Sequence, residues 1–299
     1  MRQRGITSPE SFEKGNGQNF MKADLHCHSK ASDGSLTAEE LISLAKRQEI
    51  TAISITNHDT MNGTDKALQL GARVGIQVIP GVEISAYDYD RKRKVHLLCY
   101  MPDHPEQINA FCQPTIKNRQ KAALMMLQKI MRLYSIPTDI VAKRAAGSTN
   151  IYKQHIMHAL MECGYSKDLY GDLYQKLFDP ETGLAYFPVE YPDVRDAIAA
   201  ARNAGGVVIL AHPYLYDSYD LMTELTEEGM LDGIEAYHSR YDLDSSMKLS
   251  AFAHDHKLLV TGGSDFHGMY SSRSIRLGSC TTPEKCFREL LAYKQNKQK

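Results

Sequence analysis

The sequence predicts an α/β fold, and three observations support this class. Seven apolar runs have the length of buried strands, and apolar residues between several of them recur with the spacing of a helix. Strands that alternate with helices at this spacing are typical of parallel βα units. Side chains that can ligate metals stand beside these runs along nearly the whole chain, which predicts a site where the strands end.

The predicted elements follow one another in a regular order. Strands are expected at residues 22–28, 51–56, 76–84, 94–100, 206–211, 233–238 and 258–262. Helices are expected at residues 37–48, 63–73, 192–204 and 283–294. Thr37 and Glu40 fit a capping box at the start of the first helix, and Gly205 marks the end of the third.

The segment 105–190 interrupts this alternation. Its pattern is mostly helical, and Pro and Gly punctuate it. We expect a helical insertion that forms a cap over a main domain made of residues 21–104 and 191–299. The methionines of the insertion are expected to pack a small core of its own: Met125, Met126, Met131, Met157 and Met161.

Composition and charge exclude several classes of protein. The net charge of −1 gives no global field that would recruit long duplex nucleic acid, and no apolar run is long enough to span a membrane. Residues 1–20 lack the apolar stretch of a secretory signal and are expected to form a disordered arm. Six cysteines without a CxxC pair favour reduced thiols and a cytoplasmic protein. The sequence leaves the oligomeric state open.

Nine side chains form the candidate site, and all are of types that ligate Zn, Mn or Fe. They are six histidines, two aspartates and one glutamate: His26, His28, Asp33, His58, Glu83, His96, His212, Asp265 and His267. One ion needs only three or four protein ligands. Nine candidates therefore predict a cluster of two to three divalent metal ions.

The placement of these residues favours a shared cavity. His26 and His28 lie two apart on a predicted strand and therefore point to the same side. Other candidates lie at or just past the ends of apolar runs, namely His58, Glu83, His212 and Asp265. In an α/β barrel, the loops that follow the strands build the active face.

Each candidate also has an ordinary structural interpretation when it is taken alone. His96 could be a core histidine, and His58-Asp59 could be a turn or a helix cap. His238 ends an apolar run and could contact a substrate or pack internally. Arg119, at the start of a long predicted helix, is a candidate clamp for an anion, although such an arginine is more often a solvated helix residue.

The motifs that carry these residues resemble those of the PHP (polymerase and histidinol phosphatase) superfamily, over about residues 22–299. The motifs are DLHCHSKASDG, TNHDT, GVEIS, VHLLCY, Asn118-Arg119, AGGVVILAHP, GIEAYH and GGSDFHG. Within the superfamily, the chain resembles stand-alone phosphoesterases that act on nucleotides and oligoribonucleotides. The resemblance implies a distorted (β/α)7 barrel with a trinuclear metal site at its mouth.

The resemblance also implies a role for each candidate. The first metal would be held by His26, His28, Glu83 and Asp265, the second by Asp33, His58 and His267, and the third by Glu83, His96 and His212. Glu83 would bridge metals, and Arg119 would contact the phosphate. Asp59 would contact and orient a ligand residue without binding a metal itself.

Two positions depart from the pattern of this group. Asn57 stands where the group often has Asp, and Tyr241 stands where it often has His. Tyrosine keeps a hydroxyl donor but cannot become a cation near neutral pH. We therefore expect a changed contact behind the ligands and a changed contact near the substrate.

These observations predict a metal-dependent phosphoesterase. A metal-activated hydroxide would attack a nucleoside mono- or bisphosphate or a short RNA end. Arg119 would hold a phosphoryl oxygen, and His238 or a metal-bound water would protonate the leaving group. Two alternatives stay open: a histidinol-phosphate phosphatase and a non-catalytic, metal-stabilised module. The helical insertion followed by AHP favours the nucleotide group over the first, and nine competent ligands favour an enzyme over the second.

Overall fold

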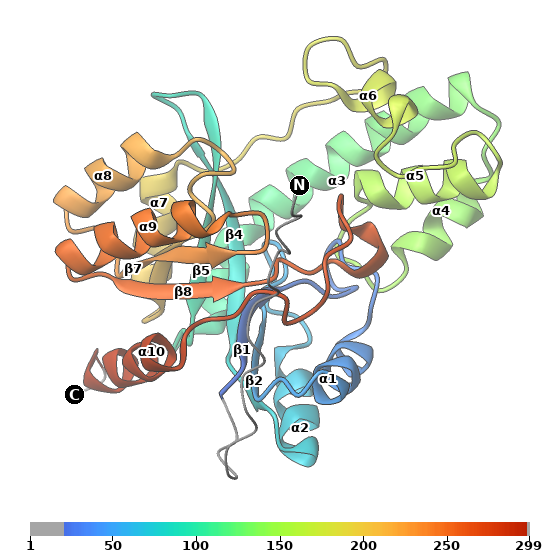
Figure 1. Ribbon diagram of the computed structural model, residues 1–299. Coiled ribbons are helices and arrows are strands. Elements are labelled where there is room, and N and C mark those ends of the chain that lie inside the picture. Colours follow the sequence, from blue (N-terminus) through green and yellow to red (C-terminus); the bar gives the residue numbers. More distant parts are fainter. Residues whose placement is uncertain (1–20, 298–299) are drawn as a thin grey trace, which may run out of the picture.

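The computed structural model describes residues 21–297, and it has a mixed α/β fold in which helices flank two sheets (Figure 1). The arm expected at residues 1–20 lies outside the described residues. The predicted strands and helices recur at nearly the expected places. The pairing of the strands differs from the expectation in two respects.

The first sheet is parallel and has three strands. These are β1 (Ala23–Cys27), β2 (Ala52–Ile55) and β3 (Gln77–Val78). Helices α1 (Ala38–Arg47) and α2 (Thr64–Val74) connect them and pack together beside the sheet. The predicted capping box is present at α1, where Thr37 Oγ1 accepts from the Glu40 N–H and the Glu40 carboxylate accepts from the Thr37 N–H.

The second sheet has five strands in chain order. They are β4 (Gly81–Asp88), β5 (Arg93–Tyr100), β6 (Val207–Leu210), β7 (Gly233–His238) and β8 (Leu259–Gly263). Four helices belong to this half of the molecule: α7 (Val194–Asn203), α8 (Tyr219–Glu227), α9 (Leu243–Asp255) and α10 (Glu284–Lys297). A short 3-10 helix at Gly268–Tyr270 follows β8.

The parallel βα units expected for several of the strands do not include β4 and β5. The loop at residues 89–92 is too short for a crossover, so these strands form an antiparallel hairpin, and β6 then pairs antiparallel to β5. The predicted strand 76–84 divides at Pro80, so the described residues contain eight strands rather than seven.

Neither sheet is closed, so a barrel closed by continuous strand pairing is not observed. Two isolated bridges join the sheets, one from Cys27 to Phe266 and one from His58 to Glu83. At the first, a Cβ on Gly263 would lie 2.4 Å from the backbone nitrogen of His26, so only glycine allows this approach. The candidate residues of β1 and of the segment after β8 are thereby brought side by side.

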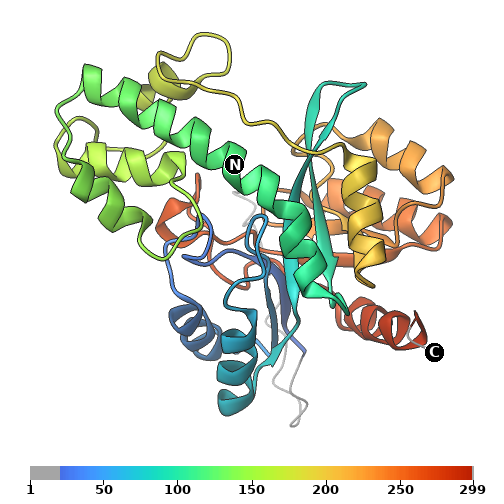
Figure 2. The same cartoon turned by 180° about the vertical axis from the view of Figure 1, so that it is seen from behind.

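A separate group of helices comes from the middle of the chain. It consists of α3 (Pro105–Leu133), α4 (Thr138–Ala145), α5 (Lys153–Glu162) and α6 (Asp172–Phe178). The long helix α3 runs from the β4–β5 hairpin to the other three (Figure 2). These helices share a hydrophobic cluster that includes Met126 and Met157, whereas Met125 and Met131 are exposed, so only part of the methionine prediction was correct.

Candidate metal centre

All nine predicted ligands meet at one place, where the two sheets adjoin. His26 comes from β1, Glu83 from β4 and His96 from β5, and the others lie in the segments that follow β1, β2, β6 and β8: His28, Asp33, His58, His212, Asp265 and His267. Seven of the nine line a cavity of about 230 Å³, and the other two, His26 and His28, are fully buried. The sequence therefore predicted the members of the cluster, although Glu83 and His96 lie within strands rather than after them.

Glu83 is at the centre of the cluster. One carboxylate oxygen lies 3.2 Å from His26 Nε2, 3.0 Å from His28 Nε2 and 3.3 Å from His58 Nδ1. The other lies 2.6 Å from His96 Nδ1 and 2.9 Å from His212 Nε2. One carboxylate thus contacts five imidazoles that come from both sheets.

The two aspartates, Asp33 and Asp265, each contact several histidines of the cluster. Asp33 lies 3.3 Å from His267 Nε2 and 3.7 Å from His58 Nε2. Asp265 lies 3.4 Å from His28 Nε2 and 3.5 Å from His267 Nδ1. Each aspartate is buried and shares histidines with the other, so the ligand atoms form one continuous cluster.

The donor atoms fit divalent cations. Three groups of three or four of these side chains have their donor atoms within 4.8 Å of one another, and a fourth such group combines His26 and His212 with Glu235. Several buried metal-ligating atoms lack a hydrogen-bond partner among the described residues. They are Nε2 of His26, both ring nitrogens of His28, Nδ1 of His58 and of His96, and Oε2 of Glu83. Buried polar atoms are rarely left unbonded. A metal cluster requires imidazole nitrogens and carboxylate oxygens that are close together and have free lone pairs, and this site provides them.

Electrostatics keep the carboxylates charged despite their burial. Burial by itself raises the pKa of Glu83, but His96, His58 and His26 hold it well below its usual value. Burial lowers the pKa of His58 well below its usual value, so this imidazole is neutral at physiological pH. Charged carboxylates and a neutral imidazole are the protonation states that bind metals.

His267 behaves in the opposite way. Burial lowers the pKa of this imidazole, but Asp33 and Asp265 outweigh that effect and raise it to about 9. The shift measures the excess of negative charge that surrounds the ring. A cation bound by the two aspartates would compete with that proton.

The backbone is strained at the site. Asp59, His212 and Asp265 have φ values of 58°, 26° and 51°, in the left-handed region that residues with a Cβ seldom adopt. Such conformations persist where the surrounding structure imposes them, and they cluster at functional sites. His212 and Asp265 lie two residues past the ends of β6 and β8, where this backbone conformation turns the chain at the cluster.

Glu235 and Asp24 belong to the site, although sequence reasoning assigned neither a role. Glu235, fully buried in β7, bonds to His26 Nδ1 at 2.9 Å and accepts the His212 N–H at 2.9 Å. Asp24 accepts from Ser264 Oγ at 2.6 Å and from the Gly278 N–H at 2.7 Å, which fixes the segment after β8. A lone carboxylate within each apolar strand was the available signal.

The two unusual positions have definite contacts. Asn57 Oδ1 accepts from the N–H and the hydroxyl of Ser29 and from the Ser32 hydroxyl, which holds the turn that carries Asp33. The Tyr241 hydroxyl accepts the Tyr214 N–H at 3.0 Å, beside the segment of His212. Both side chains act on the backbone, and Tyr241 lines neither of the two cavities at the centre.

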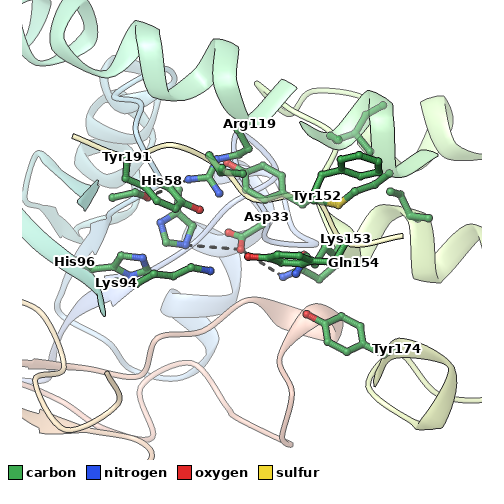
Figure 3. Close-up of a pocket in the computed structure, with 18 of the residues that line it drawn as sticks. Asp33, His58, Lys94, His96, Arg119, Tyr152, Lys153, Gln154, Tyr174 and Tyr191 are labelled. Carbon is green, nitrogen blue, oxygen red and sulfur yellow. Dashed lines mark hydrogen bonds and ion pairs between the residues drawn. The ribbon is translucent and has the colours of Figure 1, made fainter. Parts of the chain in front are cut away.

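A second cavity of about 250 Å³ adjoins the cluster and reaches the helices from the middle of the chain. Arg119 of α3 enters it from above, between Tyr152 and Tyr191, with Asp33 and His58 below (Figure 3). Arg119 Nη2 donates to Asp59 Oδ2 at 2.7 Å and to Ser85 Oγ at 3.0 Å, and its buried Nε has no hydrogen-bond partner among residues 21–297. The structure thus brings Arg119 to the cluster, and Asp59 contacts Arg119 directly.

His238 lies on the far side of Asp265. Its Nε2 is 3.4 Å from Asp265 Oδ2, and its Nδ1 accepts the Arg240 N–H at 3.2 Å. The ring is fully buried and lines neither cavity. In this position His238 contacts a candidate ligand, not the space where a substrate would bind.

Comparison with known proteins identifies the family. The PHP domain profile matches residues 24–173, about half of the chain. The chain is 38% identical over 252 residues to the phosphoribosyl 1,2-cyclic phosphate 1,2-diphosphodiesterase of Eggerthella lenta, which covers 84% of this chain and 95% of that protein. The chain belongs to the PHP domain family.

Two further similarities fit a PHP protein. The 3',5'-nucleoside bisphosphate phosphatase of Chromobacterium violaceum is 29% identical over 257 residues, which cover 82% of this chain and 86% of that protein. A crystal structure from Bifidobacterium adolescentis, described as a metal-dependent phosphoesterase, superposes with a TM-score of 0.81 at 30% identity, over 91% of this chain and 96% of that one. No helix within residues 21–297 is both long and apolar enough to cross a membrane.

Proposed function

We propose that this PHP protein is a metal-dependent phosphoesterase that hydrolyses phosphate esters of nucleotides: nucleoside mono- or bisphosphates or short RNA ends. The observation that carries the proposal is the adjacency of two features. A buried cluster of nine metal-binding side chains lies directly beside a cavity that contains Arg119. The similar proteins named above act on phosphate esters that carry nucleosides or phosphoribose.

Two to three divalent ions occupy the cluster in this proposal, and Mn, Fe or Zn suits its donors. The first ion would be held by His26, His28, Glu83 and Asp265, the second by Asp33, His58 and His267, and the third by Glu83, His96 and His212. The contacts of both Glu83 oxygens with histidines of different groups support a bridging role for this carboxylate. Glu235 fixes the ring of His26 through Nδ1, which leaves Nε2 for a metal.

When bound, such ions lower the pKa of a coordinated water to about 7 and neutralise charge on phosphoryl oxygens. The chain's own groups position the substrate. Arg119 binds a non-bridging oxygen of the phosphoryl group with the guanidinium edge that Asp59 does not occupy. Asp59 and Ser85 fix that guanidinium before the substrate arrives, which reduces the entropy lost on binding.

His238 acts on the reaction through Asp265. Because its Nδ1 accepts a backbone N–H, a neutral ring carries its proton on Nε2, which faces Asp265. It therefore orients this ligand, as a carboxylate's hydrogen-bond partner does in other metal sites. Protonation of the leaving group is then left to a water in the cavity.

The helices α3 to α6 serve as a cap that forms one wall of the substrate cavity. The two sheets together act as a distorted, incompletely paired barrel whose open end carries the ligands. The substrate is a small phosphorylated molecule and not long duplex nucleic acid, since a cavity of about 250 Å³ holds roughly one nucleotide. We place the activity in the cytoplasm, in accord with six cysteines that form no disulfide.

The test combines metal analysis with a substrate panel. Protein purified without chelator is expected to contain two to three divalent ions per chain by elemental analysis. It is expected to release phosphate from nucleoside bisphosphates faster than from histidinol phosphate. A metal content near zero that does not rise after addition of Mn or Zn would refute the metal centre. A higher kcat/KM for histidinol phosphate would refute the nucleotide assignment.

A further inference from the structure

Lys153 is a second cation in the substrate cavity, and the roles described above do not use it. It is the first residue of α5, and its side chain lies on the side of the cavity opposite Lys94 and His96 (Figure 3). Its ammonium group lies 4.9 Å from the centre of the Tyr186 ring, 5.4 Å from that of Phe178 and 6.0 Å from that of Tyr174. Three aromatic rings therefore surround one ammonium group.

No described carboxylate forms an ion pair with Lys153, and no hydrogen bond of its ammonium group is found among residues 21–297. Burial, together with a smaller effect of the like charge of Lys94, lowers the pKa of this lysine to about 8. A partly buried lysine normally has a carboxylate or a carbonyl oxygen as its partner. At neutral pH the Lys153 ammonium group is thus a cation that faces a cavity without a counter-ion.

The position of Lys153 relates it to the metal centre. The next residue, Gln154, donates from Nε2 to Asp33 Oδ2 at 3.4 Å, so α5 begins at the edge of the ligand cluster. Lys153 itself lines only the larger cavity, whereas Asp33, His58 and His96 line both. A ligand that reaches Lys153 can therefore have another part at the metal centre.

We propose that Lys153 binds a second phosphoryl group of the substrate, one that is not hydrolysed while it is bound there. This inference rests on the proposed phosphoesterase function and specifies its substrate class: phosphate esters with two phosphoryl groups on one small molecule. Arg119 and the metal centre take the reacting phosphoryl group, and Lys153 takes the other. Tyr174 and Tyr186 flank the ammonium group and restrict its positions, which lowers the entropy lost when it binds the anion.

A purely structural role is the competing interpretation. In that case Lys153 would only hold α5 against α6 and the segment of Tyr186 through cation–π contacts, which are worth about 0.5–2 kcal/mol. The loss of a purely structural contact would affect the hydrolysis of all substrates equally. A subsite affects only substrates that carry the second phosphoryl group, so the two roles differ in substrate dependence.

The experiment compares Lys153→Gln, Lys153→Arg and wild type on adenosine 3',5'-bisphosphate, adenosine 3'-monophosphate and adenosine 5'-monophosphate, all with added Mn. Lys129→Gln, on the exposed side of α3, is the control for loss of one positive charge. Lys153→Gln is expected to reduce kcat/KM for the bisphosphate about 10- to 100-fold, mainly through KM, because a hydrogen bond to a charged group is lost. The monophosphate that has its reacting group in the same position is expected to change less than about threefold. Lys153→Arg is expected to recover most of the bisphosphate activity because it keeps the charge.

The outcomes separate this inference from the proposed function. If Lys153→Gln slows the bisphosphate and both monophosphates equally, or slows none of them, the inference is overturned while the phosphoesterase function stands. If wild type hydrolyses no phosphate ester, the proposed function fails, and calorimetry then decides the inference. If wild type and Lys153→Gln have equal dissociation constants for adenosine 3',5'-bisphosphate, the inference is overturned. A larger dissociation constant for the variant would support the inference. Melting temperatures of all variants identify any loss that comes from unfolding.

Discussion

The metal centre and the adjoining cavity differ in how their charges are compensated. In the centre, every carboxylate contacts several imidazoles, and the ligands come from both sheets. In the cavity, Arg119 and Lys153 come from separate helices, and aromatic rings surround both. The centre therefore has the donors that hold cations, and the cavity has the groups that hold anions.

This difference indicates which parts of a reaction each region controls. Fixed strand ends position the ligands, so a change there should remove the chemistry altogether. Side chains of the helical layer line the adjoining cavity, so in the proposed function a change there should alter affinity and selectivity.

The first prediction concerns the ligands. Asp265→Ala or His28→Ala removes a donor that contacts the central cluster, and the expected loss is about a thousandfold or more in kcat, since bound metals contribute several kcal/mol to such reactions. Circular dichroism should show a retained fold. Asp255→Ala, an exposed aspartate of α9, is the matched control and should be fully active. Activity within tenfold of wild type at equal metal content would disprove the ligand assignment.

Arg119 provides the next largest effect. Arg119→Ala removes the anion contact in the cavity and is expected to lower kcat/KM about 10- to 100-fold. Arg119→Lys keeps a charge but loses the planar fork, so it should recover only part of the activity. Steady-state kinetics on one nucleotide substrate decides the matter. A kinetically silent Arg119→Ala would show that Asp59 and Arg119 form an ion pair of structural importance only.

Metal removal tests how far the centre also stabilises the fold. Ions that bind only the folded chain stabilise it by about 4 kcal/mol at a thousandfold excess over their dissociation constant. Dialysis against a chelator should therefore lower the melting temperature by several degrees, and Mn should restore it. The Asp265→Ala variant serves as the control, since its melting temperature should respond less to Mn. If Mn raises the melting temperatures of both proteins equally, the stabilising ion binds outside the cluster that contains Asp265.

The smallest effect concerns a titratable group in the helical layer. Burial lowers the pKa of His155 in α5 to about 4, and its Nδ1 accepts the Tyr152 N–H at 3.1 Å. The unfolded chain binds this proton near pH 6.5, so the stabilisation is complete above that pH and is lost as the pH falls towards 4, by up to about 3 kcal/mol.

His155→Gln keeps an acceptor at the third helical position but does not titrate. Denaturant unfolding at pH 7 and at pH 4.5 is the measurement. The free energy of unfolding should fall less with acid in the variant than in wild type. Equal falls would show that His155 does not contribute to the acid sensitivity of this layer.

The sequence predicted which candidate side chains come together better than it predicted the pairing of the strands. The ligands could be found because imidazoles and carboxylates beside apolar runs are chemically conspicuous, and residues two apart on a strand share a side. The open arrangement of the two sheets could not be predicted, because it depends on how β1 meets the segment after β8, and these parts of the chain are more than two hundred residues apart. The antiparallel hairpin was predictable in principle from the short loop between Asp88 and Arg93.

Other features needed the tertiary structure. Glu235 was visible as a carboxylate in an apolar strand, but only the fold shows that it bonds His26. Lys153 follows Tyr152 in a stretch without a motif, and its three aromatic neighbours come from residues more than twenty positions away. Its lack of a counter-ion is a property of the folded chain alone.

The distribution of the ligands along the chain has a consequence for synthesis. Residues 24–173, which match the PHP domain profile, contain six of the nine, and His212, Asp265 and His267 come later. Translation must pass β8 before the ion site has all its donors. A polypeptide released early therefore lacks His212, Asp265 and His267 and cannot assemble the full cluster. Because the last candidate ligands follow β6 and β8, the cluster is complete only when both sheets are in place.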